Sequence, residues 1–97
     1  MADIEVNSAS ISQMEKNVRT GLEHLTASMK NVRIGMEELN KTWEGPNHEA
    51  FEKAFLENYA DMTKLEKMLE HYADSLKKAA KTYRECEKEV AQIVRRQ

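Results

Sequence analysis

The chain has 97 residues, which fits one small domain and leaves no room for a second. Few helix breakers (one proline and three glycines) and many Glu, Lys, Leu, Met and Ala residues predict an all-α protein. A net charge of −2 lacks the basic excess of a nucleic-acid-binding protein, a single cysteine excludes an intrachain disulfide, and no apolar run reaches the roughly 18 residues of a membrane span.

Residues 8–41 predict the first helix. After Asn7 and Ser8, either of which can cap a helix N-terminus, apolar residues recur in steps of three and four. This spacing forms one stripe along a helix: Ile11, Met14, Val18, Leu22, Leu25, Met29, Val32, Met36 and Leu39. Gly21 and Gly35 each cost about 1 kcal/mol relative to alanine, and we interpret them as points of close approach by another backbone.

Residues 42–46 predict a turn. The break is Trp43-Glu44-Gly45-Pro46. Glycine commonly follows a helix end because it accepts a left-handed conformation, and proline suits the first turn of the next helix. A short break between two long helical patterns predicts an antiparallel hairpin.

Residues 47–94 predict the second helix, with an apolar seam of 3.5-residue period that is typical of supercoiled packing. Asn58 is the polar interruption in this seam, and Tyr59 beside it is a candidate to supply the missing bulk. The seam comprises Phe55, Asn58, Met62, Leu65, Leu69, Tyr72, Leu76, Ala79, Tyr83, Cys86, Val90 and Ile93.

The unequal helix lengths predict an oligomer. At 1.5 Å per residue the two helices span about 50 and about 70 Å, so Ser8 should face the region of Thr82 and the residues after Tyr83 should extend beyond the first helix. The apolar pattern nevertheless continues there. Two helices alone also cannot bury stripes this wide, so we expect two hairpins to pair into a four-helix bundle, by default as a homodimer.

The whole chain resembles the WXG100 family, the small early-secreted-antigen-type proteins that type VII secretion systems export. The resemblance begins with the chain length and with Trp43 and Gly45 at a turn between two long helices. It extends to the family's export signal, Tyr-x-x-x-Asp/Glu followed by hydrophobic residues. Tyr83, Glu87, Val90 and Val94 occupy these positions, and their spacing places them along one helix face.

The lack of a catalytic constellation predicts a non-enzymatic protein. The resemblance implies one that is made in the cytoplasm and secreted without a cleaved signal peptide. It further implies an antiparallel dimer, formed with itself or with a paralogue, in which the turn of one protomer lies near the export signal of the other. The implied partners are the motor ATPase of the secretion system and a larger co-secreted toxin. The protein's role outside the cell is then that of an effector or of a co-secreted partner.

The sequence predicts no catalytic, cofactor or metal site. Cys86 lies on the apolar seam and is interpreted as a small buried hydrophobe. The three histidines, His24, His48 and His71, lack the spacing of a metal site. Glu87, without the resemblance, would be part of a solvated helix face, and Trp43 fits equally a recognition contact or the end of a bundle core.

Two alternatives to export remain open at this point. The first is a cytosolic homodimeric adaptor or chaperone for larger secreted toxins, which a fractionation experiment distinguishes from an exported protein. The second is a membrane-active helical protein, in which an amphipathic stripe would insert into lipid if the dimer opened. Packing between helices already accounts for the stripes, so the second alternative is the weaker one.

Overall fold

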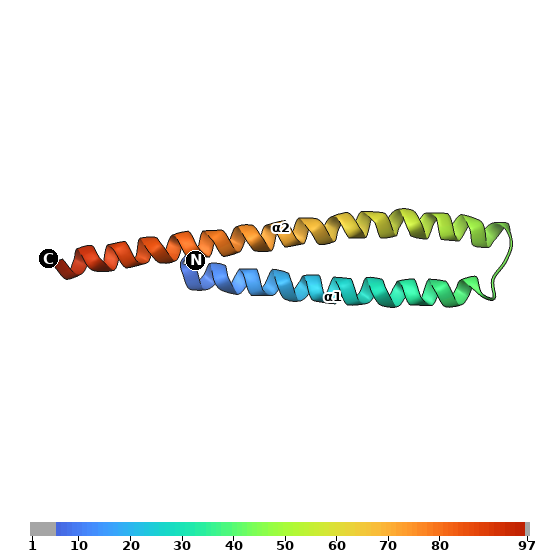
Figure 1. The fold of residues 1–97 in the computed structure, drawn as a ribbon, viewed down its shortest axis with the longest axis horizontal. Helices are drawn as coiled ribbons and strands as arrows, with labels where there is room; N and C mark the ends of the chain where they lie inside the picture. Colours follow the sequence, from blue (N-terminus) through green and yellow to red (C-terminus); the bar gives the residue numbers. More distant parts are fainter. Residues whose placement is uncertain (1–5, 97) are drawn as a thin grey trace, which may run out of the picture.

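The computed structural model describes residues 6–96 and consists of two long antiparallel helices, α1 (Ser8–Asn40) and α2 (Pro46–Arg96). The molecule is a rod measuring 78 × 28 × 17 Å, with the connection at one end and the free C-terminal part of α2 at the other (Figure 1). The predicted all-α hairpin is therefore confirmed. Residues 1–5 and 97 of the predicted domain lie outside the described part.

Local chemistry sets the N-terminus of α1. The Asn7 side chain accepts a hydrogen bond from the Ser10 backbone N–H at 2.8 Å, and the Ser10 hydroxyl accepts one from the Asn7 backbone N–H at 3.0 Å. This reciprocal capping box satisfies two backbone donors that the helix itself leaves free. Of the two cap candidates in the sequence, Asn7 takes the role and Ser8 begins the helix.

The connection follows the turn chemistry of its residues. The Trp43 backbone N–H donates to the Leu39 carbonyl at 2.9 Å, which closes the last turn of α1. Gly45 has φ 111°, a conformation that side chains with a Cβ rarely adopt. Pro46 is the first residue of α2, where its missing N–H breaks no helical hydrogen bond.

The interior of the hairpin is sparse. Its buried hydrophobic residues are Met29 and Met36 of α1 and Ala73 and Ala80 of α2. Ala73 and Ala80 lie seven residues apart and expose at most 1% of their surface, which places the small side chains of α2 directly against α1. Half-buried side chains complete the contact: Ile11, Val18, Leu22, Leu25, Phe55, Tyr59, Leu69 and Leu76. No large side chain among residues 6–96 is fully buried.

The predicted seam on α2 is partly wrong, because the apolar stripe is wider than the contact between two helices. Tyr59 lies toward α1, while Asn58 is exposed. Several other residues of the two predicted apolar stripes also face outward, at 42–60% exposure: Met14 and Val32 of α1, and Met62, Leu65, Tyr72, Tyr83, Val90 and Ile93 of α2. The hairpin thus buries one edge of each stripe and leaves the other edge uncovered.

The pairing of the two helices also differs from the sequence expectation. Side-chain hydrogen bonds join Asn40 to Glu52, Thr26 to Glu66 and Arg19 to Asp74. At the open end Ser8 pairs with Glu87, five residues beyond the predicted Thr82. The turn is centred near Pro46 instead of near Gly45, and the offset between the helices grows toward the open end.

Candidate functional site: the C-terminal arm and the turn

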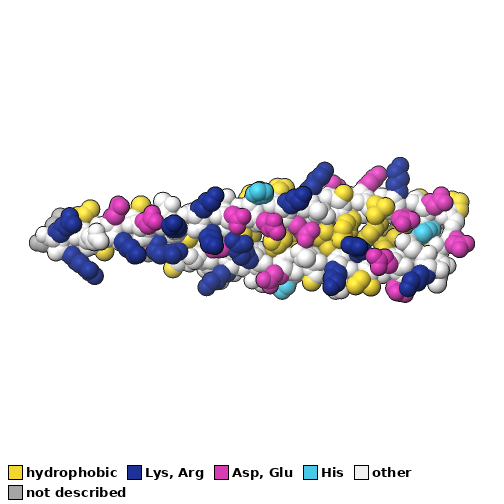
Figure 2. Space-filling model, in the orientation of Figure 1, with side chains coloured by type: hydrophobic (Ala, Val, Ile, Leu, Met, Phe, Trp, Pro, Cys, Tyr) yellow, Lys and Arg dark blue, Asp and Glu magenta, His cyan; other side chains and the backbone are white. Residues whose placement is uncertain are grey.

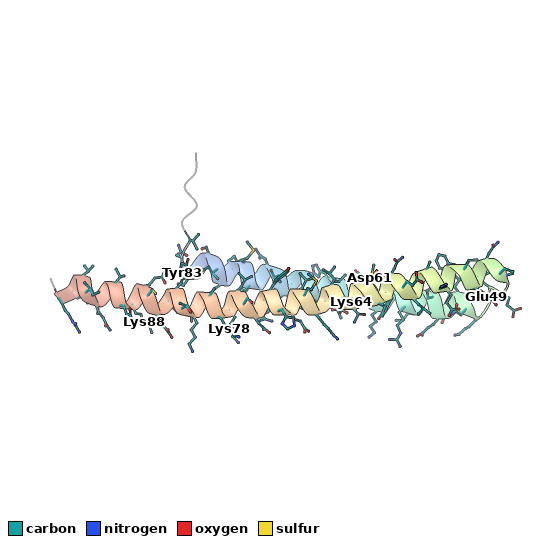
Figure 3. All side chains as sticks on the ribbon, turned by 90° about the horizontal axis from the view of Figure 1, so that it is seen from above. Glu49, Asp61, Lys64, Lys78, Tyr83 and Lys88 are labelled. Carbon is teal, nitrogen blue, oxygen red and sulfur yellow. The ribbon has the colours of Figure 1, made fainter. Side chains whose placement is uncertain are left out.

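The last part of α2, residues 81–96, is exposed along its whole length and is called the C-terminal arm here. The apolar residues of the predicted export signal protrude from it, with Tyr83 exposed by 42%, Val90 by 60% and Val94 by 64%. In Figure 3 Tyr83 is labelled on one edge of α2, and Lys78 and Lys88 on the opposite edge. The arm therefore presents an apolar face that the hairpin's own packing does not use.

Glu87, the acidic residue of the predicted signal, contacts the beginning of α1. One carboxylate oxygen accepts the Ser8 hydroxyl hydrogen bond at 2.5 Å, and the other accepts the Ser8 backbone N–H at 3.3 Å. α1 has no acidic residue in its own first turn, so Glu87 supplies the negative charge that favours a helix N-terminus. Glu87 is exposed, as a residue of a solvated helix face is, and in addition its carboxylate is held by Ser8.

The turn carries an aromatic cluster. The Trp43 ring is half-buried and lies 5.1 Å from the His48 ring and 5.5 Å from the Phe51 ring, centroid to centroid. His48 Nε2 also hydrogen-bonds Asn40 Oδ1 at the end of α1. Trp43 thus closes the end of the hairpin while part of its ring remains accessible.

Within one hairpin the two motifs lie far apart. The turn with Trp43 and Gly45 is at one end of the 78 Å rod, and the C-terminal arm is at the other end (Figure 1). A single protomer therefore does not bring Trp43 near Tyr83 or Glu87. Any site that combines the two motifs requires a second chain.

One side of the hairpin is apolar and is called the apolar face here. A shallow groove on this side is lined by residues of both helices: Leu25, Ser28, Met29, Val32, Phe55, Asn58, Tyr59 and Met62. Leu65 and Tyr72 follow Asn58 at intervals of seven residues, which continues the same face along α2. Leu65 is exposed by 43% and Tyr72 by 54%, so this surface lacks a cover.

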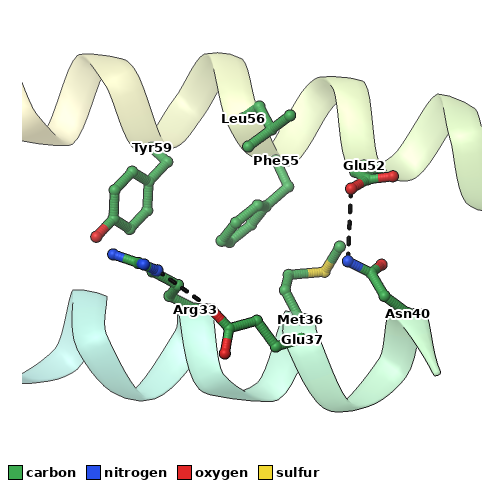
Figure 4. Close-up of a pocket in the computed structure, with 8 residues that line it drawn as sticks. All are labelled: Arg33, Met36, Glu37, Asn40, Glu52, Phe55, Leu56 and Tyr59. Carbon is green, nitrogen blue, oxygen red and sulfur yellow. Dashed lines mark hydrogen bonds and ion pairs between the residues drawn. The ribbon is translucent and has the colours of Figure 1, made fainter.

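The other side of the hairpin carries charged and polar groups around a second groove (Figure 4). Arg33 donates to Glu37 at 3.4 Å, and the Asn40 amide donates to Glu52 at 3.4 Å. The rest of the lining is Met36, Phe55, Leu56 and Tyr59. Figure 2 shows charged side chains of both signs along the rod, with hydrophobic atoms visible between the helices near the turn end.

Arg19 links the two helices on the surface. Its guanidinium donates to Glu15 at 2.8 Å and to Asp74 at 3.2 Å. These hydrogen bonds, that to Glu15 first, raise the pKa of Arg19 above its ordinary value. Because all three side chains are accessible to water, we interpret these ion pairs as contacts that align the two helices and not as part of a functional site.

The family follows from a comparison of the whole sequence. The family model described as proteins of 100 residues with WXG matches residues 3–88. The chain belongs to the WXG100 family. Trp43 and Gly45 occupy the Trp-x-Gly positions that give the family its name, and in this member they form the connection between α1 and α2. A search of curated protein sequences finds no match.

Solved structures of a secreted protein share the fold. EsxB from Bacillus anthracis strain Sterne superposes with a TM-score of 0.81 at 18% identity, covering 90% of this chain and 99% of that one. A glutamate-to-glutamine variant of EsxB gives a TM-score of 0.81 at 18% identity, with 90% and 97% covered. The wild type in another crystal form gives 0.79 at 19% identity, with 87% and 97% covered.

The rest of this WXG100 chain offers little chemistry for a cofactor or metal. Among residues 6–96 no three His, Cys, Asp or Glu side chains gather as metal ligands would. Cys86 is exposed on the C-terminal arm, so the prediction of a buried cysteine is wrong: at this level of α2 the side chain that contacts the start of α1 is that of its neighbour Glu87. Over the same residues no helix is long and apolar enough to cross a bilayer.

Two residues at the ends of the hairpin make contacts that the sequence analysis does not predict. The sequence marks Ser8 only as a possible cap, and no local signal indicates a partner 79 positions away. His48 lacks the spacing of a metal ligand, but an aromatic residue five positions after Trp43, across a Gly-Pro turn, is a signal for ring packing at the tip. Both contacts depend on how the helices pair.

Proposed function

We propose that this WXG100 protein is a secreted substrate of a type VII secretion system and acts through protein–protein contacts, as an effector or as the co-secreted partner of a larger toxin. The export signal in this proposal is Tyr83, Glu87, Val90 and Val94. The observation that carries it is the C-terminal arm, whose apolar residues have the spacing of the signal and lie outside the hairpin's core. The motor ATPase of the secretion system is the partner that would read this face.

The exported form in this proposal is a dimer. The small number of buried residues in the hairpin supports it. The accessible surface is 8141 Å², whereas a compact monomer of this mass exposes about 5,700 Å². The excess is of the size that one subunit buries in an obligate dimer. The uncovered apolar face supplies the contact surface, and pairing it with a second hairpin gives a four-helix bundle.

The charge distribution favours an antiparallel arrangement of this dimer. Residues 37–61, around the turn, contain seven acidic and two basic side chains, whereas residues 77–96 contain seven basic and three acidic ones. Figure 2 shows Lys and Arg gathered over the C-terminal half of α2. Placing the acidic turn of one protomer beside the basic arm of the other brings opposite charges together and would put Trp43 near the partner's signal.

The glycines of α1 are consistent with a second chain. A Cβ added at Gly21 or Gly35 would meet nothing within 4 Å. The sequence predicts that another backbone approaches these glycines closely, and α2 of the same hairpin is not that backbone. Gly21, Ser28 and Gly35 recur every seven residues, on the flank where Ser28 borders the apolar-face groove. Small side chains at this interval leave room for a helix of the partner.

The proposal is tested by measuring the fraction of protein in the culture supernatant and in the lysate of a host with an active type VII system. The variant is Glu87→Ala, and the matched control is Glu89→Ala, which removes an equal charge from an exposed residue of the same arm that makes no such contact. Dimerisation of every variant is measured by light scattering. We expect export of the wild type and of Glu89→Ala, and loss of export for Glu87→Ala although it still dimerises.

The same experiment addresses the alternative role. If the wild type stays inside intact cells while a known substrate of the same system is exported, the cytosolic adaptor becomes the better assignment. If Glu87→Ala is exported as efficiently as the wild type, the assignment of the signal is wrong. A co-precipitation from the cytosol with a larger toxin would then identify the adaptor's client.

A further inference from the structure

We propose that Ser8 is a positioning residue of the export signal: it holds the Glu87 carboxylate in place, so that the signal is built from both ends of the hairpin. This inference rests on the proposed function, since it concerns how the same signal is presented. It adds a residue from α1 to a motif that the sequence places wholly on α2. The motor would then read a Glu87 side chain whose position depends on the closed hairpin.

The geometry fixes the carboxylate at two points. The Ser8 hydroxyl and the Ser8 backbone N–H reach different oxygens of Glu87, at 2.5 Å and 3.3 Å, which sets both the position and the plane of the group. Glu87 is the one member of the four signal residues with a hydrogen-bond partner on α1 among residues 6–96. The last buried residue of α2 is Ala80, so no core contact steadies this part of the helix.

The contact leaves Glu87 able to bind a partner. A carboxylate offers about four lone-pair directions, and Ser8 occupies only two of them. The residue is exposed, and Tyr83, one helical turn before it, is exposed on the same side. A cationic or hydrogen-bond-donating group of the motor can therefore bind the carboxylate and the tyrosine together while Ser8 keeps its hold.

A role for Ser8 in positioning differs from a role in stability. The N-terminus of α1 has its own cap, because Asn7 and Ser10 bond each other without using Glu87. Removal of the Ser10 hydroxyl therefore weakens the same helix end and leaves the Glu87 contact in place. This makes Ser10→Ala a matched control for any general loosening of α1.

The experiment combines an export assay with a spectroscopic signature. Export is measured for Ser8→Ala, Ser8→Thr, Ser10→Ala, Glu87→Ala and the double variant Ser8→Ala/Glu87→Ala, each checked for dimerisation. The Ser8 amide resonance is recorded by NMR in the wild type and in Glu87→Gln, because loss of a charged acceptor shifts a bonded amide proton. We expect the Ser8 amide resonance to shift in Glu87→Gln. We also expect export of Ser8→Ala to drop about fivefold, because the variant loses one charge-assisted hydrogen bond at an exposed site.

Three further results are expected. Ser8→Thr keeps the hydroxyl and should be exported as the wild type is, Ser10→Ala should retain export, and the double variant should be no worse than Glu87→Ala. Equal losses for Ser8→Ala and Ser10→Ala, or full export of Ser8→Ala, would overturn the inference while the Glu87 signal stands. Full export of Glu87→Ala would instead overturn the proposed function, and the inference with it.

Discussion

Leu65→Ala tests whether the apolar face is the dimer interface. Leu65 is exposed by 43% in the hairpin, so its truncation should also remove the contribution of the part that is already covered, about 0.9–1.7 kcal/mol per protomer. Full burial of a leucine side chain contributes about 1.5–3 kcal/mol, so covering the exposed 43% contributes about 0.6–1.3 kcal/mol. A symmetric dimer contains the residue twice, so Leu65→Ala should weaken the free energy of dimerisation by about 1.3–2.6 kcal/mol. The dissociation constant should then rise about tenfold to seventyfold.

The matched control is Leu56→Ala. Leu56 is a leucine of the same helix and is exposed by 57%, but it lies among charged residues on another flank: Glu49, Glu52, Lys53 and Glu57. It should leave the dissociation constant unchanged within about twofold, as expected for an exposed position outside the interface.

Sedimentation equilibrium over a range of protein concentrations measures both constants, and circular dichroism checks that each variant remains helical. Equal effects of Leu65→Ala and Leu56→Ala would refute the assignment of the face. A monomeric wild type at micromolar concentration would refute the dimer itself.

Three further substitutions probe the hairpin. Ala73 exposes none of its surface, so Ala73→Leu forces a large side chain into the contact between the helices. The free energy of unfolding in urea should fall by about 1–3 kcal/mol; a neutral result would show that the helices are not in contact there. Gly45→Ala has free space for its Cβ but a strained φ of 111°, so thermal unfolding should show a loss of about 1–3 kcal/mol. Gly35→Ala should stabilise dilute, monomeric protein by about 0.5–1 kcal/mol and weaken dimerisation; stronger dimerisation would exclude the partner from that flank.

Much of the fold was predictable because it depends on neighbours in sequence. The capping groups before α1, the steps of three and four, and the Gly45-Pro46 break act within a few residues of each other. The observed helices therefore begin and end within two residues of the predicted 8–41 and 47–94. The positions of Trp43 and Tyr83 at opposite ends of the rod follow from those lengths alone.

The choice of inward residues was not predictable from spacing. Steps of three and four fit both edges of a wide stripe, and Tyr59 and Asn58 are both compatible with a seam. The outcome depends on which pairs of side chains fit between two helices, and here Ala73 and Ala80 occupy the inner edge of α2. Leu65 and Leu69, equivalent in the sequence pattern, thus differ in the hairpin: the first is exposed and the second is half-buried.

The sequence by itself determined two helices, their turn and the location of the residues proposed as the export signal, since each of these rests on local spacing and capping. Tertiary structure alone decided the pairing of Ser8 with Glu87. A small shift of the turn and the growing offset between two long helices move that contact by five residues, and no local rule reports such a shift. The exposed Glu87 carboxylate consequently contacts the start of α1, because the helix N-terminus and the Ser8 hydroxyl attract its charge.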